Sequence, residues 1–370
     1  MKTVLAIIIA LHGLIHLLGF IKAFGLAEIG GLKKPVSKSA GVLWLIAGIL
    51  LFSVAIFIFL GKDWWWIVAV PAIILSQALI ISAWQDARFG TIANVVAAIA
   101  AVLMFGSWNF HRGFEKDYHE NLVRTGTLTS SILSEDDIQH LPAPVQRYIR
   151  YTGSVGHEKV HNIKISFKGQ MRDKGLDWFD LQSVQYNFFD IPTRLFYMTG
   201  KMKGMTVPGY HAYKNGNASM QIKLFGLLPI VDSKEGDLNQ AETVTFLNDM
   251  CLMAPATLID ERVKWEEIDS LSSKAIFTCN GITVSAILHF NDKGQLVNFI
   301  SDDRFAISDK KSSRQRFSTP VYDYKNINGI NICSKAETVW HYPDGEFVYG
   351  RFELQTIEYN VKENSITPEK

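Results

Sequence analysis

Two histidines in the first apolar stretch of the chain are the residues whose type and spacing could most directly support chemistry. His12 and His16 lie four residues apart in the string LHGLIHLLGF, so a helix would place both on one face. Imidazole is a common metal ligand, and ionisable groups inside membrane helices are often functional, which suggests a metal, haem or proton-handling pair. The alternative is that both rings are neutral and hydrogen-bond to a neighbouring helix, with Gly13 and Gly19 permitting close packing.

The sequence favours the second interpretation of this histidine pair. The other three apolar stretches contain no His, Cys, Asp or Glu that could complete a metal site. We therefore predict no resident metal or cofactor, and keep a metal or haem site at His12 and His16 as the alternative. A second subunit could supply the missing ligands.

A short charged group, Asp302, Asp303 and Arg304, follows the predicted strand Leu296–Ser301. Acid and base side chains at a strand end could bind a polar head group or hold an acid catalyst. Such groups more often form an ion pair at a turn, and no feature of the sequence shows that these side chains converge in a cleft. We favour the structural interpretation, and keep Asp302 and Arg304 as polar candidates for a ligand site.

A third set of candidates is apolar and would line a ligand cavity. In the predicted strand Ala218–Phe225, three apolar residues alternate with polar ones, which places Met220, Ile222 and Leu224 on one face. Large rings in other predicted strands could line the same cavity, although such rings more often fill a core. These rings are Trp178, Trp265 and Trp340.

The cysteines and the known catalytic motifs give little support for an enzyme. Cys251, Cys279 and Cys333 have no C-x-x-C spacing, and each lies in apolar sequence, which predicts buried free thiols rather than a zinc site. The sequence contains no G-x-S-x-G, G-x-x-x-x-G-K or H-E-x-x-H motif. The well-marked hydrolase, NTPase and zinc-protease classes lose support, and the balance favours a protein that is not an enzyme.

The elements that position these residues fall into two halves of different composition. With 37 basic and 36 acidic side chains, the chain has no overall field that would attract nucleic acid. Its first 112 residues contain four uncharged apolar stretches, each with about the 20 residues that a helix needs to cross a membrane. They are Thr3–Ile21, Ala40–Leu60, Trp64–Gln85 and Thr91–Phe110. We predict a four-helix transmembrane block over residues 1–112.

The flanks of these stretches predict processing and orientation. The first stretch is longer than the core of a signal peptide, and three more follow it, which favours an uncleaved anchor. The short loop after it carries Lys22, Lys33, Lys34 and Lys38, which predicts that this loop is cytoplasmic. Both termini, and the long region after residue 112, are then expected outside the cytoplasm.

The second half predicts an antiparallel sheet. After a linker over residues 113–134, about eleven segments alternate with period two, and turn sequences such as Asn280-Gly281 join them. The segment Asn239–Asp260 instead repeats its apolar residues at helical spacing, with Pro255 ending or kinking the helix. A long sheet covered by one or two helices curls into an incomplete barrel, which can leave an apolar cavity. We predict an α+β half-barrel over residues 135–362, followed by a tail over residues 363–370.

Several strings in this half resemble those of a family of uncharacterised bacterial membrane-anchored proteins. They are LPAPVQRY at residues 141–148, FLNDMCLMAPATLID at 246–260, SDDRF at 301–305, FSTP at 317–320 and WHYPDGEF at 340–347. The resemblance implies a four-helix N-terminal block followed by a β-rich domain similar to the lipoprotein-carrier (LolA/LolB-like) fold. It implies no catalytic residue.

Together these patterns predict a multi-pass protein of the bacterial inner membrane. We expect its extracytoplasmic half-barrel to bind an apolar or amphipathic ligand, either a lipid or a lipidated protein, with the lipid bilayer as its other partner. One alternative is a redox, metal or haem protein that uses His12 and His16, with the sheet as a sensor or docking module. A second is an envelope scaffold without a ligand.

Overall fold

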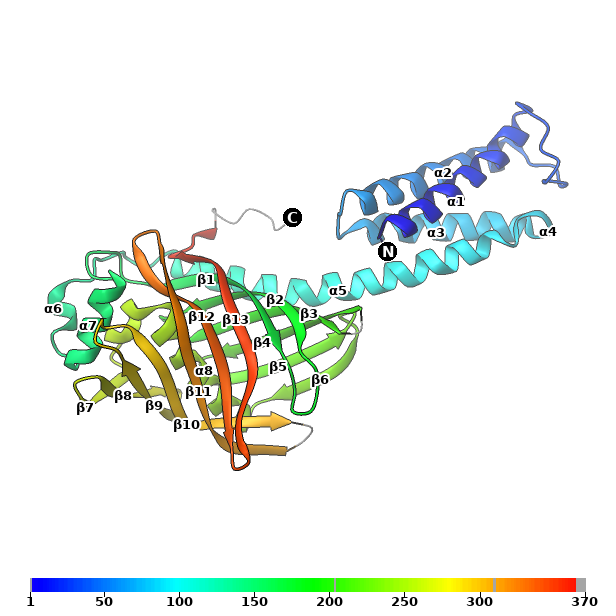
Figure 1. Ribbon diagram of the computed structural model, residues 1–370. Coiled ribbons are helices and arrows are strands. Elements are labelled where there is room, and N and C mark those ends of the chain that lie inside the picture. Colours follow the sequence, from blue (N-terminus) through cyan, green and yellow to red (C-terminus); the bar gives the residue numbers. More distant parts are fainter. Residues whose placement is uncertain (1, 203, 309–310, 364–370) are drawn as a thin grey trace. The chain divides into compact units, whose positions relative to one another are not determined.

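Four long apolar helices form the first part of the chain in a computed structural model that describes residues 2–202, 204–308 and 311–363 (Figure 1). They are α1 (Lys2–Ala23), α2 (Lys38–Phe59), α3 (Trp65–Ser82) and α5 (Gly90–Thr125), with the single turn α4 (Trp84–Ala87) between the last two. Each long helix has the length and hydropathy needed to cross a membrane. The four predicted spans are therefore confirmed as helices.

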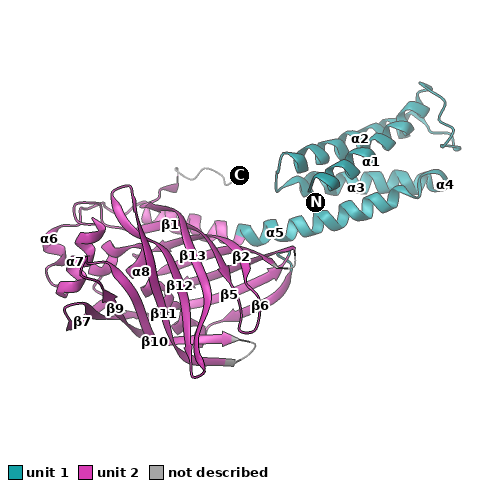
Figure 2. Cartoon of the chain, viewed as in Figure 1, with its two compact units in different colours: residues 1–112, 225–227, 368–370 teal, residues 113–224, 228–367 magenta. Residues whose placement is uncertain are grey.

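The chain divides into two compact units (Figure 2). The first, here called the helical unit, contains residues 1–112 and 225–227, and the second, the sheet unit, contains residues 113–224 and 228–367. Of the predicted tail over residues 363–370, only residue 363 lies within the described part of the chain.

Small residues bring α1 and α2 close together in the helical unit. A Cβ atom on Gly13 would lie 3.2 Å from the backbone oxygen of Gly48, and one on Gly48 would lie 3.1 Å from that of Gly13. Further along, a Cβ atom on Gly19 would lie 2.5 Å from the ring of Trp44. Glycine thus allows the backbone contact that lipid-solvated helices use in place of a hydrophobic driving force.

Helix α5 continues well beyond its apolar half, and its residues from Gly113 on belong to the sheet unit. Phe114, Tyr118 and Leu122 recur at a spacing of four and are buried against strands of the sheet. The sequence predicts a linker over residues 113–134, but residues 113–125 are helical. The amphipathic spacing of these three residues is the signal that hydropathy alone does not detect.

Two short helices precede the sheet. Helix α6 (Glu135–Ile138) begins with a capping box in which Ser134 and Asp137 bond to each other's backbone N–H. Helix α7 (Ala143–Thr152) ends at Gly153, whose left-handed backbone suits a glycine.

In the described part of the chain, thirteen strands form one antiparallel sheet, which confirms the predicted curled half-barrel. Their order is β6-β5-β4-β3-β2-β1-β13-β12-β11-β10-β9-β8-β7, so the first strand pairs with the last and β6 and β7 are the open edges. Their bounds are Asn162–Met171 (β1), Phe179–Phe188 (β2), Thr193–Met202 (β3), Met205–Lys214 (β4), Asn217–Leu224 (β5), Leu228–Lys234 (β6), Val263–Asp269 (β7), Ser272–Cys279 (β8), Ile282–Phe290 (β9), Leu296–Ser308 (β10), Lys311–Ile327 (β11), Ile330–Tyr342 (β12) and Gly345–Tyr359 (β13).

The two strands beyond the predicted eleven are β4 and β6, and both contain a proline. Pro208 in β4 pairs with Thr199 of β3, while the pairing with β5 begins only at Gly209, so no ladder bond to β5 is lost at the proline. Pro229 lies in β6, at the open edge of the sheet. Proline usually indicates a break in a strand, and these positions are the exceptions that tolerate it.

One helix fills much of the concave side of the sheet. Helix α8 (Asp237–Met253) connects the two halves of the sheet and packs against strands from both, and the 3-10 turn η1 (Pro255–Ile259) follows it (Figure 1). The predicted helix over residues 239–260 is thus confirmed, with Pro255 after its end. Its apolar side chains are fully buried in the main core of the unit; among them are Val244, Phe246, Leu247, Met250 and Cys251.

Candidate functional site

The concave face of the sheet unit carries its side chains in rows that run across the strands. Residues that pair directly in neighbouring antiparallel strands point to the same face, and successive rows on that face are about 7 Å apart. One row holds Asn187, Arg194, Tyr213 and Ala218, the next holds Gln185, Phe196, His211 and Met220, and the third holds Ser183, Met198, Gly209 and Ile222.

A charged cluster joins α8 to the first two rows. Asp249 of α8 accepts hydrogen bonds from Arg194 Nε (2.8 Å), Gln185 Nε2 (2.8 Å) and Asn187 Nδ2 (3.0 Å). Glu242, two turns earlier on α8, accepts from Arg194 Nη1 at 3.2 Å. The Arg194 side chain is only 10% exposed, so water screens these pairs little. Burial raises the pKa of Asp249, while Arg194 and Asn187 act to lower it.

His211 lies beside this cluster with one ring nitrogen unused. Its Nε2 is buried and has no hydrogen-bond partner in the described part of the chain. Burial is the main cause that lowers the pKa of His211 to about 4, with Glu242 opposing the shift and Arg194 and Arg304 adding to it. The imidazole is therefore neutral near pH 7 and can offer either a donor or an acceptor.

Arg304 of β10 lies on the same concave side, over the rings of Phe317 (4.2 Å to the centroid) and Trp340 (5.0 Å). Its Nη1 donates to the hydroxyl of Tyr349 at 2.6 Å. Its Nε is buried and, among the described residues, finds no acceptor. A guanidinium always carries its charge and only donates, so this N–H is available to an acceptor oxygen.

A second apolar cluster lies beyond α8 on the concave face, separate from the main core. Its buried members are Leu181, Phe196 and Met198, and its partly buried members are Met171, Phe179, Ile222 and Phe352. We call this set the distal patch. Phe196 and Met198 belong to the second and third rows, so the distal patch begins beside His211. The concave face thus passes from a charged cluster to unpartnered polar atoms and then to an apolar surface.

Four of the predicted apolar site residues lie on this face. Met220 pairs with His211 and packs against the main core, and Ile222 belongs to the distal patch. Leu224 follows two residues later and shares their face of β5 by alternation. Trp340 is buried and stacks on Tyr349 with ring centroids 5.6 Å apart.

The other predicted rings are placed differently. Trp178 is predicted to lie in a strand, but it lies in the connection between β1 and β2, just before β2 begins. There it lies between the guanidinium groups of Arg172 (4.4 Å) and Arg351 (4.5 Å). Trp265 is in the edge strand β7, where its Nε1 donates to the backbone oxygen of Leu258 at 3.2 Å. Neither ring joins the distal patch.

Asp302 and Arg304 do not act as a pair. Strand β10 extends to Ser308 rather than ending at Ser301, and its register with β11 shifts between Ser301 and Arg304, so the regular alternation of faces is broken between Asp302 and Arg304. Asp302 is exposed and accepts from Arg316 Nε at 2.7 Å across the β10 and β11 strands, whereas Arg304 faces the aromatic rings. The predicted structural ion pair is thus present for Asp302, within a strand rather than at a turn.

The histidine pair lies inside the helical unit, and both side chains are buried. His12 Nε2 contacts Asn94 Oδ1 (3.0 Å) on α5 and Ser76 Oγ (3.2 Å) on α3. The interpretation that an imidazole bonds to neighbouring helices is confirmed for His12. Among the described residues, no group of three or more His, Cys, Asp or Glu side chains could hold a metal ion.

Sequence reasoning does not identify the charged cluster or His211. Asp249 and Glu242 stand out only as acids inside an otherwise apolar helix, and the partner Arg194 is about 50 residues away in sequence. His211 lies in β4, the strand that its proline and glycine conceal.

Three comparisons relate this chain to known proteins. The model of a family described as "Family of unknown function (DUF6544)" matches residues 131–352, which is more than half of the chain. No curated protein matches it. Among solved structures, a similar one is the crystal structure of a LolA superfamily protein from Nitrosomonas europaea, with 8% identity and a TM-score of 0.34. That match covers 61% of this chain and 97% of the other, and at this TM-score it carries no argument about function.

Proposed function

We propose that this chain, which belongs to the family of unknown function DUF6544, is an integral membrane protein whose half-barrel binds an amphipathic ligand on its concave face. The matched region contains all five strings on which the resemblance to an uncharacterised family rests, so that resemblance is confirmed. The family description supplies no activity, and the proposal therefore rests on the site.

The observation that carries the proposal is two unpartnered polar atoms on the concave face: His211 Nε2 beside the distal patch, and Arg304 Nε over the rings of Phe317 and Trp340. Arg304 Nε–H can only donate, and the neutral His211 Nε2 can donate or accept, so both suit an oxygen-rich head group. Leaving such atoms buried without a partner costs free energy that a ligand would recover. The adjoining apolar side chains of the distal patch offer a surface for an acyl chain.

The proposed setting is the inner membrane of a bacterial cell. The four apolar helices support membrane insertion, and the lysines of the loop between α1 and α2 support a cytoplasmic position for that loop. The half-barrel would then lie outside the cytoplasm, where its ligand would be a lipid or the acyl group of a lipidated protein.

Native mass spectrometry with lipid extraction on the full chain, purified from membranes, tests this proposal. We expect about one co-purifying amphiphile per chain, and we expect Ile222→Arg to remove most of it, because a charge in an apolar contact costs several kcal/mol. Gln221→Arg places the same charge on the opposite face of the same strand and should leave the load unchanged.

Two results would contradict the proposal. One is an unchanged amphiphile load in a folded Ile222→Arg chain. The other is a folded wild-type chain that carries no amphiphile and takes up none from vesicles of bacterial lipid extract. The second result would support the envelope scaffold instead.

A further inference from the structure

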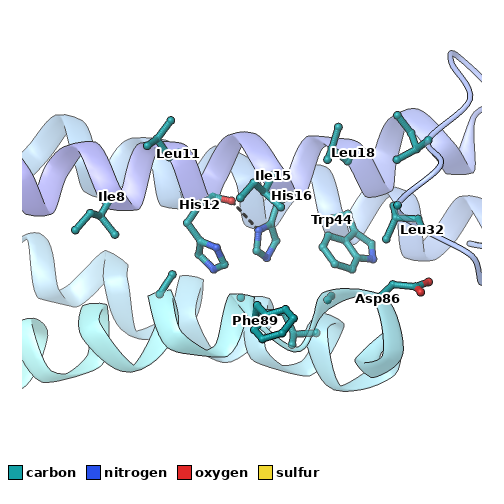
Figure 3. A pocket seen from close by; sticks show the side chains of 16 residues that line it. Ile8, Leu11, His12, Ile15, His16, Leu18, Leu32, Trp44, Asp86 and Phe89 are labelled. Carbon is teal, nitrogen blue, oxygen red and sulfur yellow. Dashed lines mark hydrogen bonds between the residues drawn. The ribbon is translucent and has the colours of Figure 1, made fainter.

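A pocket inside the helical unit is separate from the half-barrel and has no role in the function proposed above. Its volume is about 450 Å³, and it lies between α1, the loop after it, and the start of α5 (Figure 3). Both imidazole rings of the histidine pair line it, on the same side of α1. Apart from these rings and Asp86, the side chains labelled in Figure 3 are apolar or aromatic. They are Ile8, Leu11, Ile15, Leu18, Leu32, Trp44 and Phe89.

Hydrogen bonds fix His12 as a donor at Nε2. Asn94 Nδ2 donates to Gln77 Oε1 at 3.0 Å, and Gln77 Nε2 donates to Thr91 Oγ1 at 3.1 Å. The amide oxygen of Asn94 is then the atom that faces His12, and an amide oxygen only accepts. His12 Nε2 therefore carries the proton and is fully used in this network.

The backbone fixes His16 in the opposite sense. Its Nδ1 lies 3.0 Å from the backbone oxygen of His12, and a carbonyl oxygen only accepts, so Nδ1 carries the proton. In a neutral imidazole Nε2 then holds a lone pair. This Nε2 is buried and lacks a hydrogen-bond partner among the described residues. His16 is 1% exposed, so solvent does not satisfy the atom either.

The one acidic group at the pocket, Asp86, is already satisfied. The carboxylate of Asp86 accepts from the backbone N–H groups of Lys33 (2.7 Å) and Lys34 (3.0 Å). Among the side-chain atoms of the pocket lining, His16 Nε2 is the one that is fully buried without a partner in the described chain; it is an acceptor and needs a donor.

The position of the pocket restricts where a ligand comes from. Leu11 (55% exposed), Ile15 (57%) and Phe89 (71%) form its rim on the outer surface of the helices, which faces lipid in the membrane placement proposed above. His16 lies about 10 Å along the axis from the end of α1, so the acceptor is inside the hydrocarbon region. A ligand would enter from the bilayer and must be soluble in it.

We propose that this pocket binds a membrane-soluble molecule with a hydroxyl group, a phenol or a long-chain alcohol, whose O–H donates to His16 Nε2. The hydroxyl satisfies the buried acceptor, and the apolar remainder of the molecule contacts the side chains that line the pocket. A molecule of the same shape that cannot donate leaves His16 Nε2 unsatisfied and binds more weakly.

Matched probe pairs test this proposal on the full chain in lipid nanodiscs. The phenolic pair is a decyl-substituted hydroquinone and its methyl ether, and the aliphatic pair is dodecanol and its methyl ether. We expect one hydroxyl compound to bind about tenfold more tightly than its ether, the effect of one hydrogen bond of about 1.4 kcal/mol. Whichever pair shows this preference identifies the ligand as phenolic or aliphatic.

Two variants connect the preference to His16. His16→Phe keeps a ring in place but removes the acceptor, and it should abolish the preference of the hydroxyl compound over its ether. Leu14→Phe introduces the same ring on the same helix away from the pocket and should retain the preference. Thermal unfolding in nanodiscs checks that both variants fold.

Several outcomes would overturn the proposal, and the first needs no variant. In the first, the wild type binds each hydroxyl compound no better than its ether, or binds neither. In the second, the preference persists in a folded His16→Phe chain. In the third, the purified chain contains haem or a metal ion in stoichiometric amount, which would assign the Nε2 lone pair to that group instead.

Discussion

The helical unit and the sheet unit both bury polar side chains, but they do so with different chemistry. In the helical unit, His12, Ser76, Asn94 and Gln77 form one network of imidazole, hydroxyl and amide groups. In the sheet unit, the buried polar cluster is built around the guanidinium of Arg194, which pairs with two carboxylates. The helical unit thus uses groups that can remain neutral, and the sheet unit uses charges.

The surroundings proposed above, lipid for the helical unit and water for the sheet unit, explain this difference. Lipid cannot hydrate a charge, so a bundle that inserts in a membrane is cheaper to build from neutral hydrogen-bonding groups. A sheet unit that folds in water can bury a charge if its partners are complete, and a loss of one partner then leaves the other charge stranded. The comparison predicts large effects of single changes in the sheet unit and small ones in the helical network.

The largest effect should come from Asp249→Ala. Removing this carboxylate deprives Arg194, Gln185 and Asn187 of their shared acceptor and leaves the guanidinium with Glu242 as its one charged partner. We expect the free energy of unfolding of the sheet unit to fall by about 3 to 5 kcal/mol. Hydrogen exchange of peptides from α8 and β2, measured by mass spectrometry on the full chain, reports this change.

The matched control for this prediction is Asp302→Ala. Its carboxylate also pairs with an arginine, but both side chains are more than half exposed. An exposed pair contributes about 0 to 1 kcal/mol, so exchange should hardly change. Equal losses in the two variants would show that burial does not set the strength of these pairs, and the comparison would fail.

The next largest effect should be a dependence on pH that belongs to His211. Burial holds its folded pKa at about 4, below the usual 6.5, so between these values the unfolded chain binds more protons. The free energy of unfolding is therefore highest above about pH 6.5 and falls as the pH drops towards 4, by up to about 3 kcal/mol.

His211→Gln should remove this part of the pH dependence. The charged neighbours Arg194, Glu242 and Arg304, and the nearby Asp249, remain in the variant, so the difference between the two chains isolates the imidazole. Urea unfolding near neutral pH and near pH 4 measures it. Parallel pH profiles for the wild type and the variant would rule out His211 as the cause.

A packing change in the helical unit should have an intermediate effect. In Gly19→Ala the new Cβ would lie 2.5 Å from the buried ring of Trp44, so α1 and α2 must separate. We expect a loss of about 1 to 3 kcal/mol, measured by thermal unfolding in nanodiscs. Gly30→Ala is the control, because a Cβ there meets nothing within 4 Å. No loss in Gly19→Ala would mean that packing of α1 on α2 does not limit the stability of the bundle.

The sequence predicts the elements of both units because their signals are local. A helix in lipid must be apolar along its whole length, and a half-buried strand must alternate apolar and polar residues. The four spans and most of the strands can therefore be recognised in the amino-acid sequence. The misses have local causes too. Strands β4 and β6 are not predicted because each contains a proline. The second half of α5 is not predicted as a helix because it is charged and polar.

The candidate sites could be predicted only in part, because they depend on pairs far apart in sequence. His12 is conspicuous in the first span, but its partner Asn94 is an unremarkable residue of the fourth. Ile222 and Arg304 can be named from alternation and charge, yet only the register of the sheet shows which face each one occupies. The direction of the hydrogen bonds that leave His16 Nε2 unused is likewise a property of the folded bundle.

The smallest effect should come from Ser76→Ala, and it completes the comparison. Ser76 Oγ donates to Asn94 Oδ1 at 3.0 Å, but that oxygen still accepts from His12 Nε2 after the hydroxyl is removed. No buried group is then left without a partner, and a hydrogen bond between membrane helices contributes about 0.6 kcal/mol on average. Thermal unfolding in nanodiscs should show a loss of that size, and none in Ser53→Ala, whose hydroxyl bonds within its own helix. If Ser76→Ala instead costs as much as Asp249→Ala, neutral networks in lipid and charged clusters in water depend equally on each member, and the solvent is not what separates the two units.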